Sequence, residues 1–354
     1  MFQHNMVGER TDMCNFADIY GHEKIKEHLQ SAIGLGKVSH AYIINGGLGS
    51  GKKMLAQIFA KTLQCEQRQG ADEGGALDLA KINPCNECHS CIQADSANQP
   101  DIVWVRHEKP ASIGVDDIRE QVIGDIQIKP YSSRYKVYII DEAEKMTVQA
   151  QNALLKTIEE PPAYGIVILL TTNADIFLQT IISRCVLLDL KPVEDELVIK
   201  YLKDKFGTTD YECRFAAAFA QGKIGRAISI VESAEFAKLK DEVLHVVKNA
   251  SGMSSSEIMA EVKTIANYKL TINDYLDLMA MWYRDVLMFK STNNINLVIF
   301  KDELSELKAQ AEVMSYEGLD DILSSIDKVK IRLKANVNFD LVIELLIMAI
   351  KENM

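Results

Sequence analysis

The sequence has no hydrophobic run long enough to cross a membrane and no excess of positive charge. Its longest apolar stretch, residues 341–350, is interrupted by Glu344, whereas a membrane helix needs about 20 apolar residues. No charged-then-apolar leader opens the chain. With 39 basic and 50 acidic residues, the formal charge is -11, which repels a phosphate backbone and argues against binding of free DNA by this chain alone. We therefore expect a cytoplasmic protein with no membrane contact.

Segments that predict strands and helices alternate along the first half of the chain. The predicted strands are residues 41–44, 102–105, 136–140, 166–171 and 186–190. The predicted helices include residues 22–33, 52–63, 115–123 and 148–159. This alternation predicts an α/β fold with a parallel sheet covered by helices on both faces. From Pro192 onward, apolar residues recur three and four positions apart, which predicts an all-helical region.

A glycine-rich stretch, Gly-Gly-Leu-Gly-Ser-Gly-Lys-Lys, begins at Gly46 between a predicted strand and a predicted helix. This is the context of the phosphate-binding loop G-x4-G-K-[ST], and an ordinary glycine turn is the simpler alternative. Gly46, Gly49 and Gly51 would let backbone N–H groups surround the phosphates of ATP or ADP, and Lys52 would reach the terminal ones. Lys53 stands where the pattern has a hydroxyl that ligates magnesium. We therefore expect weak metal-assisted hydrolysis or none.

Two carboxylates, Asp141 and Glu142, directly follow the predicted strand 136–140. In a nucleotide-hydrolysing site such a pair holds the magnesium shell and polarises the attacking water. Thr172 and Asn173 follow the next predicted strand, at the sheet edge where ligands bind. Helix capping is the simpler alternative for the acids, and a turn is the alternative for the polar pair. The nearby phosphate loop favours a nucleotide site.

Four of the seven cysteines are grouped in one part of the sequence. Cys85, Cys88 and Cys91 are separated by two residues each, and Cys65 ends the predicted helix before them. Four thiolates fit one tetrahedral metal ion and close its shell, so the predicted site is structural and not catalytic. Zinc and an iron–sulfur cluster are both compatible with these ligands, and free thiols are the simpler alternative.

Longer motifs identify a family. They are Phe-Ala-Asp-Ile-Tyr-Gly-His at 16–22, Ser-His-Ala-Tyr at 39–42, Asp-Glu-Ala-Glu at 141–144, Gln-Asn-Ala-Leu-Leu-Lys-Thr-Ile-Glu-Glu-Pro-Pro at 151–162 and Ser-Arg-Cys at 183–185. With the glycine loop they resemble the bacterial clamp-loader ATPases. The resemblance is dense over residues 16–190, and beyond residue 240 it depends on length and helical character. It implies a P-loop AAA+ domain (1–192) with a zinc-binding insertion (about 65–95), a helical lid (193–240) and an all-α collar (241–354).

The resemblance also implies a role in DNA replication. In that family, five related subunits of DNA polymerase III form a ring that opens the sliding clamp and places it on primed DNA, with ATP between neighbours. The implied partners are the gamma/tau and delta subunits, with the clamp and DNA reached through the complex. Arg184 matches the arginine finger that acts in trans on a neighbour's ATP, although a surface ion pair is the simpler alternative. The family carries zinc in the same insertion.

Two departures favour one branch of this family. Motor subunits (gamma/tau) have intact phosphate loops, whereas the delta-prime type has a degraded loop and keeps its finger. Lys53 is the first departure, and the second is Gly225, which occupies the position of the motor subunits' sensor arginine while Arg226 follows it. The chain also ends at residue 354, short of a tau tail. We expect a delta-prime accessory subunit of the polymerase with little ATPase activity of its own. The alternatives are a gamma/tau-type motor and a regulatory AAA+ protein unrelated to replication.

Overall fold

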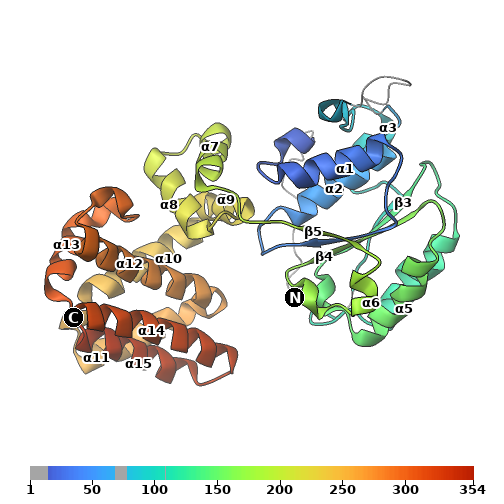
Figure 1. Ribbon diagram of the computed structural model, residues 1–354. Coiled ribbons are helices and arrows are strands. Elements are labelled where there is room, and N and C mark those ends of the chain that lie inside the picture. The colour runs from blue at the N-terminus through green and yellow to red at the C-terminus, as the bar shows by residue number, and fades with distance from the viewer. Residues whose placement is uncertain (1–14, 68–77, 108) are drawn as a thin grey trace. The chain divides into compact units, whose positions relative to one another are not determined.

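The computed structural model describes residues 15–67, 78–107 and 109–354. The chain forms two compact units. The first comprises the residues up to 197 together with 222–225, and the second comprises 198–221 and 226–354. The elements of each unit are labelled in Figure 1. The expected boundaries at residues 192 and 240 stay a prediction, and residues 68–77 of the expected insertion lie outside the described residues.

The first unit is built on a parallel sheet. Its strands are β1 (Ala41–Asn45), β2 (Ile102–Trp104), β3 (Lys136–Ile140), β4 (Gly165–Thr171) and β5 (Val186–Asp189). They lie in the order β2-β3-β4-β1-β5, and every neighbouring pair is parallel. Asn45 at the end of β1 is in register with Thr171 at the end of β4. The carboxyl ends of β1, β3 and β4 therefore share one edge of the sheet, and the predicted parallel sheet is confirmed.

Helices cover both faces of this sheet. The main ones are α1 (Glu23–Gly34), α2 (Lys52–Gln64), α5 (Val148–Glu159) and α6 (Gln179–Ile182). Alternate side chains of a strand point to opposite faces, so Ile44 packs in the cluster that contains Phe59 of α2. Its neighbour Ile43 packs in the cluster that contains Leu154 of α5. Figure 1 shows α1 and α2 on one side of the sheet and α5 and α6 on the other.

The predicted helix 115–123 has a different form in the structure. Helix α4 covers only Val115–Ile118 and continues as π-helical turns over Arg119–Gly124. The fully buried residues Ile118, Val122 and Ile126 are spaced four apart. Residues four apart lie on one face of a helix, so the segment still buries one apolar face, although its turns are wider than those of an α-helix.

The second unit is helical throughout its described residues. It contains most of α7 (Asp195–Phe206) and α9 (Ile224–Glu232), together with α8 (Asp210–Ala220), α10 (Ala234–Asn249), α11 (Ser255–Ile265), α12 (Ile272–Thr292), α13 (Leu304–Val313), α14 (Tyr316–Lys334) and α15 (Phe339–Glu352). Trp282 of α12 is fully buried and donates to the Oε1 atom of Gln310 at 2.8 Å. This bond satisfies the indole N–H inside the core, and the predicted all-helical region is confirmed. None of the described helices has both the length and the apolar character that crossing a bilayer requires.

One acid of the second unit titrates near neutral pH. Burial and then the neighbouring Glu242 on α10 raise the pKa of Glu261 on α11 to about 7. Tyr268 and Tyr275 also face this pair of carboxyl groups. The folded chain therefore keeps a proton that the unfolded chain loses near the ordinary glutamate pKa, and the contribution of Glu261 to stability falls as the pH rises through this window.

We expect this contribution to be visible in a comparison with Glu261→Gln, because an amide does not titrate. Relative to that variant, the wild type should lose stability as the pH rises from about 5 to 8, measured as urea unfolding midpoints. Glu257→Gln is a matched control, because Glu257 is exposed on the same helix. A difference between wild type and Glu261→Gln that is constant with pH would contradict the assignment.

Candidate nucleotide site and cysteine centre

The glycine loop connects β1 to α2, as the sequence predicts. Gly49 and Gly51 have φ angles of +78° and +90°, which favour glycine because a side chain is strained there. Lys52 begins α2, and its ammonium group donates to the carbonyl oxygens of Gly46 and of Gly47, the latter at 2.9 Å. Burial lowers the pKa of Lys52. The loop therefore has the left-handed glycines that its pattern predicts, and its lysine donates to the loop's own carbonyls.

Lys53 contacts the first carboxylate of the predicted magnesium site. Its Nζ atom lies 2.6 Å from the Oδ2 atom of Asp141, and the Lys53 side chain is 55% exposed. The loop and the end of β3 therefore meet, as expected from a shared sheet edge. The charge of Asp141 is already balanced by an ammonium group, which offers no lone pair to a metal ion.

Glu142 has a local partner of its own. Its backbone is left-handed, with a φ angle of +48°, and its carboxylate lies 2.7 Å from the Nζ atom of Lys145 and 4.0 Å from the Nε2 atom of His107. The ion-pair partners of the exposed Glu142 carboxylate are thus Lys145 and His107, and neither belongs to the glycine loop. Its predicted role in polarising water stays a prediction.

Thr172 and Asn173 lie at the expected edge and make local bonds. The Thr172 hydroxyl donates to Glu144 at 2.8 Å, and the Asn173 side chain accepts from the N–H of Asp175 at 3.0 Å. Burial would raise the pKa of Glu144, but hydrogen bonds from its own backbone and from Thr172 and Thr171 outweigh burial and lower it. Glu144 is thus the charged partner of this edge, a role that the sequence analysis did not assign.

A segment from the start of α9 also lies against the loop. The N–H of Gly225 donates to the carbonyl of Gly49 at 2.9 Å. A Cβ atom on Gly47 would lie 3.0 Å from the Cε atom of Lys223 and 3.6 Å from its Nζ atom. Arg226, by contrast, pairs with Asp274 at 2.6 Å and also stacks on an aromatic ring. The sequence motif does not predict a role for Lys223, because the motif position is defined by an arginine.

Arg184 follows α6 and is partly exposed. Its guanidinium lies 3.1 Å from the Oε1 atom of Glu159, and its side chain is 42% exposed. It also donates to the carbonyl of Thr180 at 3.1 Å and to the hydroxyl of Ser183 at 3.2 Å. The side chain is held at the surface by bonds that a competing anion can replace.

The four grouped cysteines converge as predicted. The sulfur atoms of Cys65, Cys85, Cys88 and Cys91 all lie within 4.8 Å of one another. The backbone N–H of Cys85 donates to the sulfur of Cys65 at 3.3 Å, and that of Cys88 donates to the sulfur of Cys85 at 3.3 Å. A hydrogen bond from Cys91 lowers the pKa of Cys65 to about 5. The cluster can hold a metal ion such as zinc, because thiolates at this spacing are its preferred ligands.

An ion pair fastens the cysteine centre to the first unit's core. Helix α3 (His89–Asp95) begins beside Cys88 and ends at Asp95. The Nζ atom of Lys61 on α2, only 1% exposed, lies 2.6 Å from the Asp95 carboxylate. His89, a spare ligand in principle, is exposed on the same helix and is not among the converging groups.

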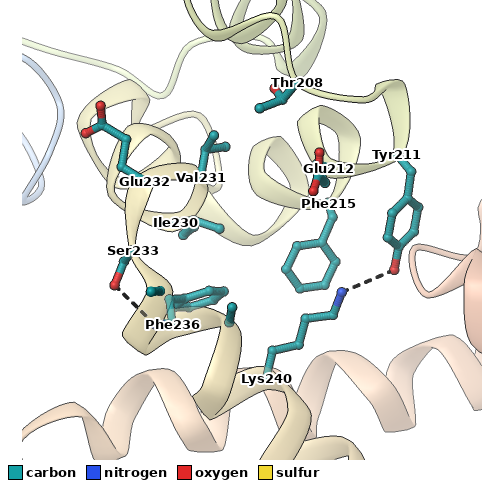
Figure 2. Close-up of a pocket in the computed structure, with 12 residues that line it drawn as sticks. Thr208, Tyr211, Glu212, Phe215, Ile230, Val231, Glu232, Ser233, Phe236 and Lys240 are labelled. Atoms are coloured by element: carbon teal, nitrogen blue, oxygen red, sulfur yellow. Dashed lines mark hydrogen bonds between the residues drawn. The ribbon is translucent and has the colours of Figure 1, made fainter.

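A separate pocket of about 370 Å³ lies within the second unit. Figure 2 shows Lys240 reaching toward Phe215 and Tyr211, with its Nζ atom 4.4 Å from the Phe215 ring centroid and 3.5 Å from the Tyr211 hydroxyl. Burial lowers the pKa of Lys240. Glu212 and Glu232 also line the pocket, so it does not present an uncompensated positive charge to an anion.

The chain is similar to known subunits of the bacterial replicative polymerase. The family model described as "DNA polymerase III, delta subunit" matches residues 21–194. DNA polymerase III subunit tau of Bacillus subtilis is 29% identical over 335 residues, covering 88% of this chain and 57% of the relative. Subunit delta' of the same organism is 28% identical over 335 residues, covering 93% of this chain and 96% of the relative.

A solved structure of a gamma subunit-related protein from Thermotoga maritima is 20% identical, with a TM-score of 0.45, and covers 93% of this chain and 99% of that one. A likeness at that level supports no functional conclusion. The chain spans little more than half the length of the tau relative, but nearly all of the delta-prime relative. The family model and these relatives agree with the motifs along residues 16–190. The chain thus matches this family model along residues 21–194, and over most of its length it is similar to the delta-prime and tau subunits of bacterial DNA polymerase III.

Proposed function

We propose that this chain is a delta-prime-type subunit, a structural member of the clamp-loader ring and not an ATPase motor. The observation that carries the proposal is the 2.6 Å ion pair between Lys53 and Asp141. A motor needs a hydroxyl and a carboxylate around magnesium. In this chain Lys53 stands at the position of the hydroxyl residue, and the Asp141 carboxylate is paired with Lys53. The similarity to subunit delta' of Bacillus subtilis, 28% identical over 335 residues, is compatible with this branch.

In this role, Arg184 acts on ATP held by a neighbouring subunit. A guanidinium placed against the transferring phosphoryl group stabilises the charge that develops there. Support comes from the partial exposure of Arg184 and from its partner Glu159, whose carboxylate is the kind of anion that a phosphate replaces. Gamma/tau and delta are the proposed partners, and the clamp and primed DNA are reached through the complex. The formal charge of -11 favours such indirect DNA contact, and the cytoplasm is the proposed location.

The metal held by Cys65, Cys85, Cys88 and Cys91 is proposed to be zinc. Its part is structural: four thiolates leave no position for water or substrate. The cross-link would join the end of α2 to the start of α3.

The second candidate is a gamma/tau-type motor that tolerates Lys53. The tau relative favours it, and so do the loop glycines, whose spacing matches the pattern G-x4-G-K. ATP hydrolysis by the purified chain in the presence of magnesium, together with its co-elution with the other subunits, distinguishes the two functions. We expect no steady hydrolysis by the chain alone, and co-elution with gamma/tau and delta subunits in one complex. Steady hydrolysis that Lys52→Ala abolishes would establish the motor and reject the delta-prime role.

A further inference from the structure

Three lysines surround the glycine loop. Lys52 ends the loop and Lys53 follows it. Lys223 reaches the loop from residues 222–225, which belong to the same compact unit as the sheet, and its Nζ atom lies 3.6 Å from where a Gly47 Cβ atom would be. The carboxylates of Glu144 and Asp141 act on Lys52. The N-terminus of the 13-residue helix α2 lies beside these ammonium groups, and its positive end favours an anion.

Magnesium does not fit this arrangement. The hydroxyl ligand is replaced by Lys53, whose ammonium group lies 2.6 Å from the Asp141 carboxylate. The Thr172 hydroxyl donates to Glu144 at 2.8 Å. A divalent cation at Asp141 would therefore have to displace an ammonium group or lie beside it against the repulsion of like charges. A phosphate chain, by contrast, is an anion that can accept hydrogen bonds from ammonium groups at this loop.

We propose that the loop binds a polyphosphate chain, such as that of ATP or ADP, as a metal-free anion. Lys53 takes the place of the magnesium ion as the counter-charge. Lys223 takes the place of the sensor arginine, because Arg226 is held by Asp274 and Asp277 at 2.6 and 3.2 Å. Lys52 exchanges its bonds to the Gly46 and Gly47 carbonyls for bonds to phosphate. This site goes beyond the proposed ring function and does not depend on it.

Calorimetric titration of the full chain with ATP, with magnesium or with EDTA, tests the proposal. We expect the wild type to bind ATP with the same affinity in both conditions. Inorganic triphosphate should compete, because the lysines recognise phosphate and not the base. The proposal would be overturned if ATP binding required magnesium or if ATP did not bind in either condition. It would also be overturned if triphosphate did not displace ATP.

Two variants assign the roles of the lysines. Lys53→Thr restores the hydroxyl and should weaken binding in EDTA by about 10- to 100-fold, the value of a charge-assisted hydrogen bond, with recovery when magnesium is added. Lys223→Ala should weaken binding by a similar factor in both conditions, whereas Lys37→Ala, an exposed lysine after α1, should change neither. Thermal unfolding without ligand checks that each variant is folded. If Lys53→Thr binds ATP in EDTA as tightly as the wild type does, the counter-charge role of Lys53 is rejected. The ring function is tested separately, by assembly with the other subunits, and does not depend on these results.

Discussion

Replacing Arg184 with alanine is expected to reduce ATP hydrolysis at the adjoining subunit's site by about 10³-fold or more in the assembled loader. In the proposed function, the substitution removes the guanidinium that would stabilise charge on the transferring phosphoryl group. The chain itself should stay folded, because the pair of Arg184 with Glu159 is exposed on both sides, at 42% and 44%. Exposed pairs contribute about 0–1 kcal/mol to stability. Single-turnover hydrolysis by the complex, with clamp and primed DNA present, measures the effect.

Two further variants separate the finger from the local ion pair. Glu159→Gln removes the pair but keeps the guanidinium, so hydrolysis should persist. Arg184→Lys keeps the positive charge but loses the planar fork that binds phosphate through two bonds, so it should recover only part of the rate. Gel filtration confirms that each variant is present in the complex. Full hydrolysis by a complex that contains the alanine variant would show that Arg184 is a surface residue with a local partner.

The sheet and most helices were predictable because their signals are local. Apolar runs placed all five strands, and the expected helix 148–159 matches α5 in both bounds. Its start is fixed by the Thr147 side chain, which accepts from the N–H of Ala150 at 3.2 Å. Its end is fixed by Pro161 and Pro162, since a residue before proline disfavours helical geometry. The cysteine cluster was predictable for a similar reason, because three of its four ligands are close in sequence.

The electrostatic state of the nucleotide site was not predictable from the sequence. Lys53 was identified as a missing metal ligand, but its pairing with Asp141 depends on the register of distant segments. Glu142 has a left-handed backbone, a conformation uncommon for a glutamate, and pairs with Lys145 three residues further on. Lys223 reaches the loop because residues 222–225 pack with the first unit, although the neighbouring helices in the sequence belong to the second. Tertiary packing thus decided the partners of Lys53 and Lys223, whereas the partner of Glu142 is local.

Loss of the metal is expected to loosen the cysteine centre without unfolding the sheet. Cys91 is fully buried, and the residues packed in its cluster are the other cysteines. A metal ion bound by the four thiolates would cross-link this segment and contribute to its local stability. Structural zinc contributes about 10–16 kcal/mol in peptides that fold only with the metal. The sheet has separate cores on both faces, so its strands should persist.

Cys91→Ser is the corresponding variant, and His89→Ala is its control on the same helix. The serine variant should contain little zinc and lose hydrogen-exchange protection in α3, whereas strands β3 and β4 keep theirs. The histidine variant should retain the metal, since its side chain is exposed and outside the converging group. Elemental analysis measures zinc and iron together and thereby also distinguishes zinc from an iron–sulfur cluster. Loss of protection throughout the sheet on chelation would mean that the centre supports the whole first unit, because the ion pair between Lys61 and Asp95 connects the two.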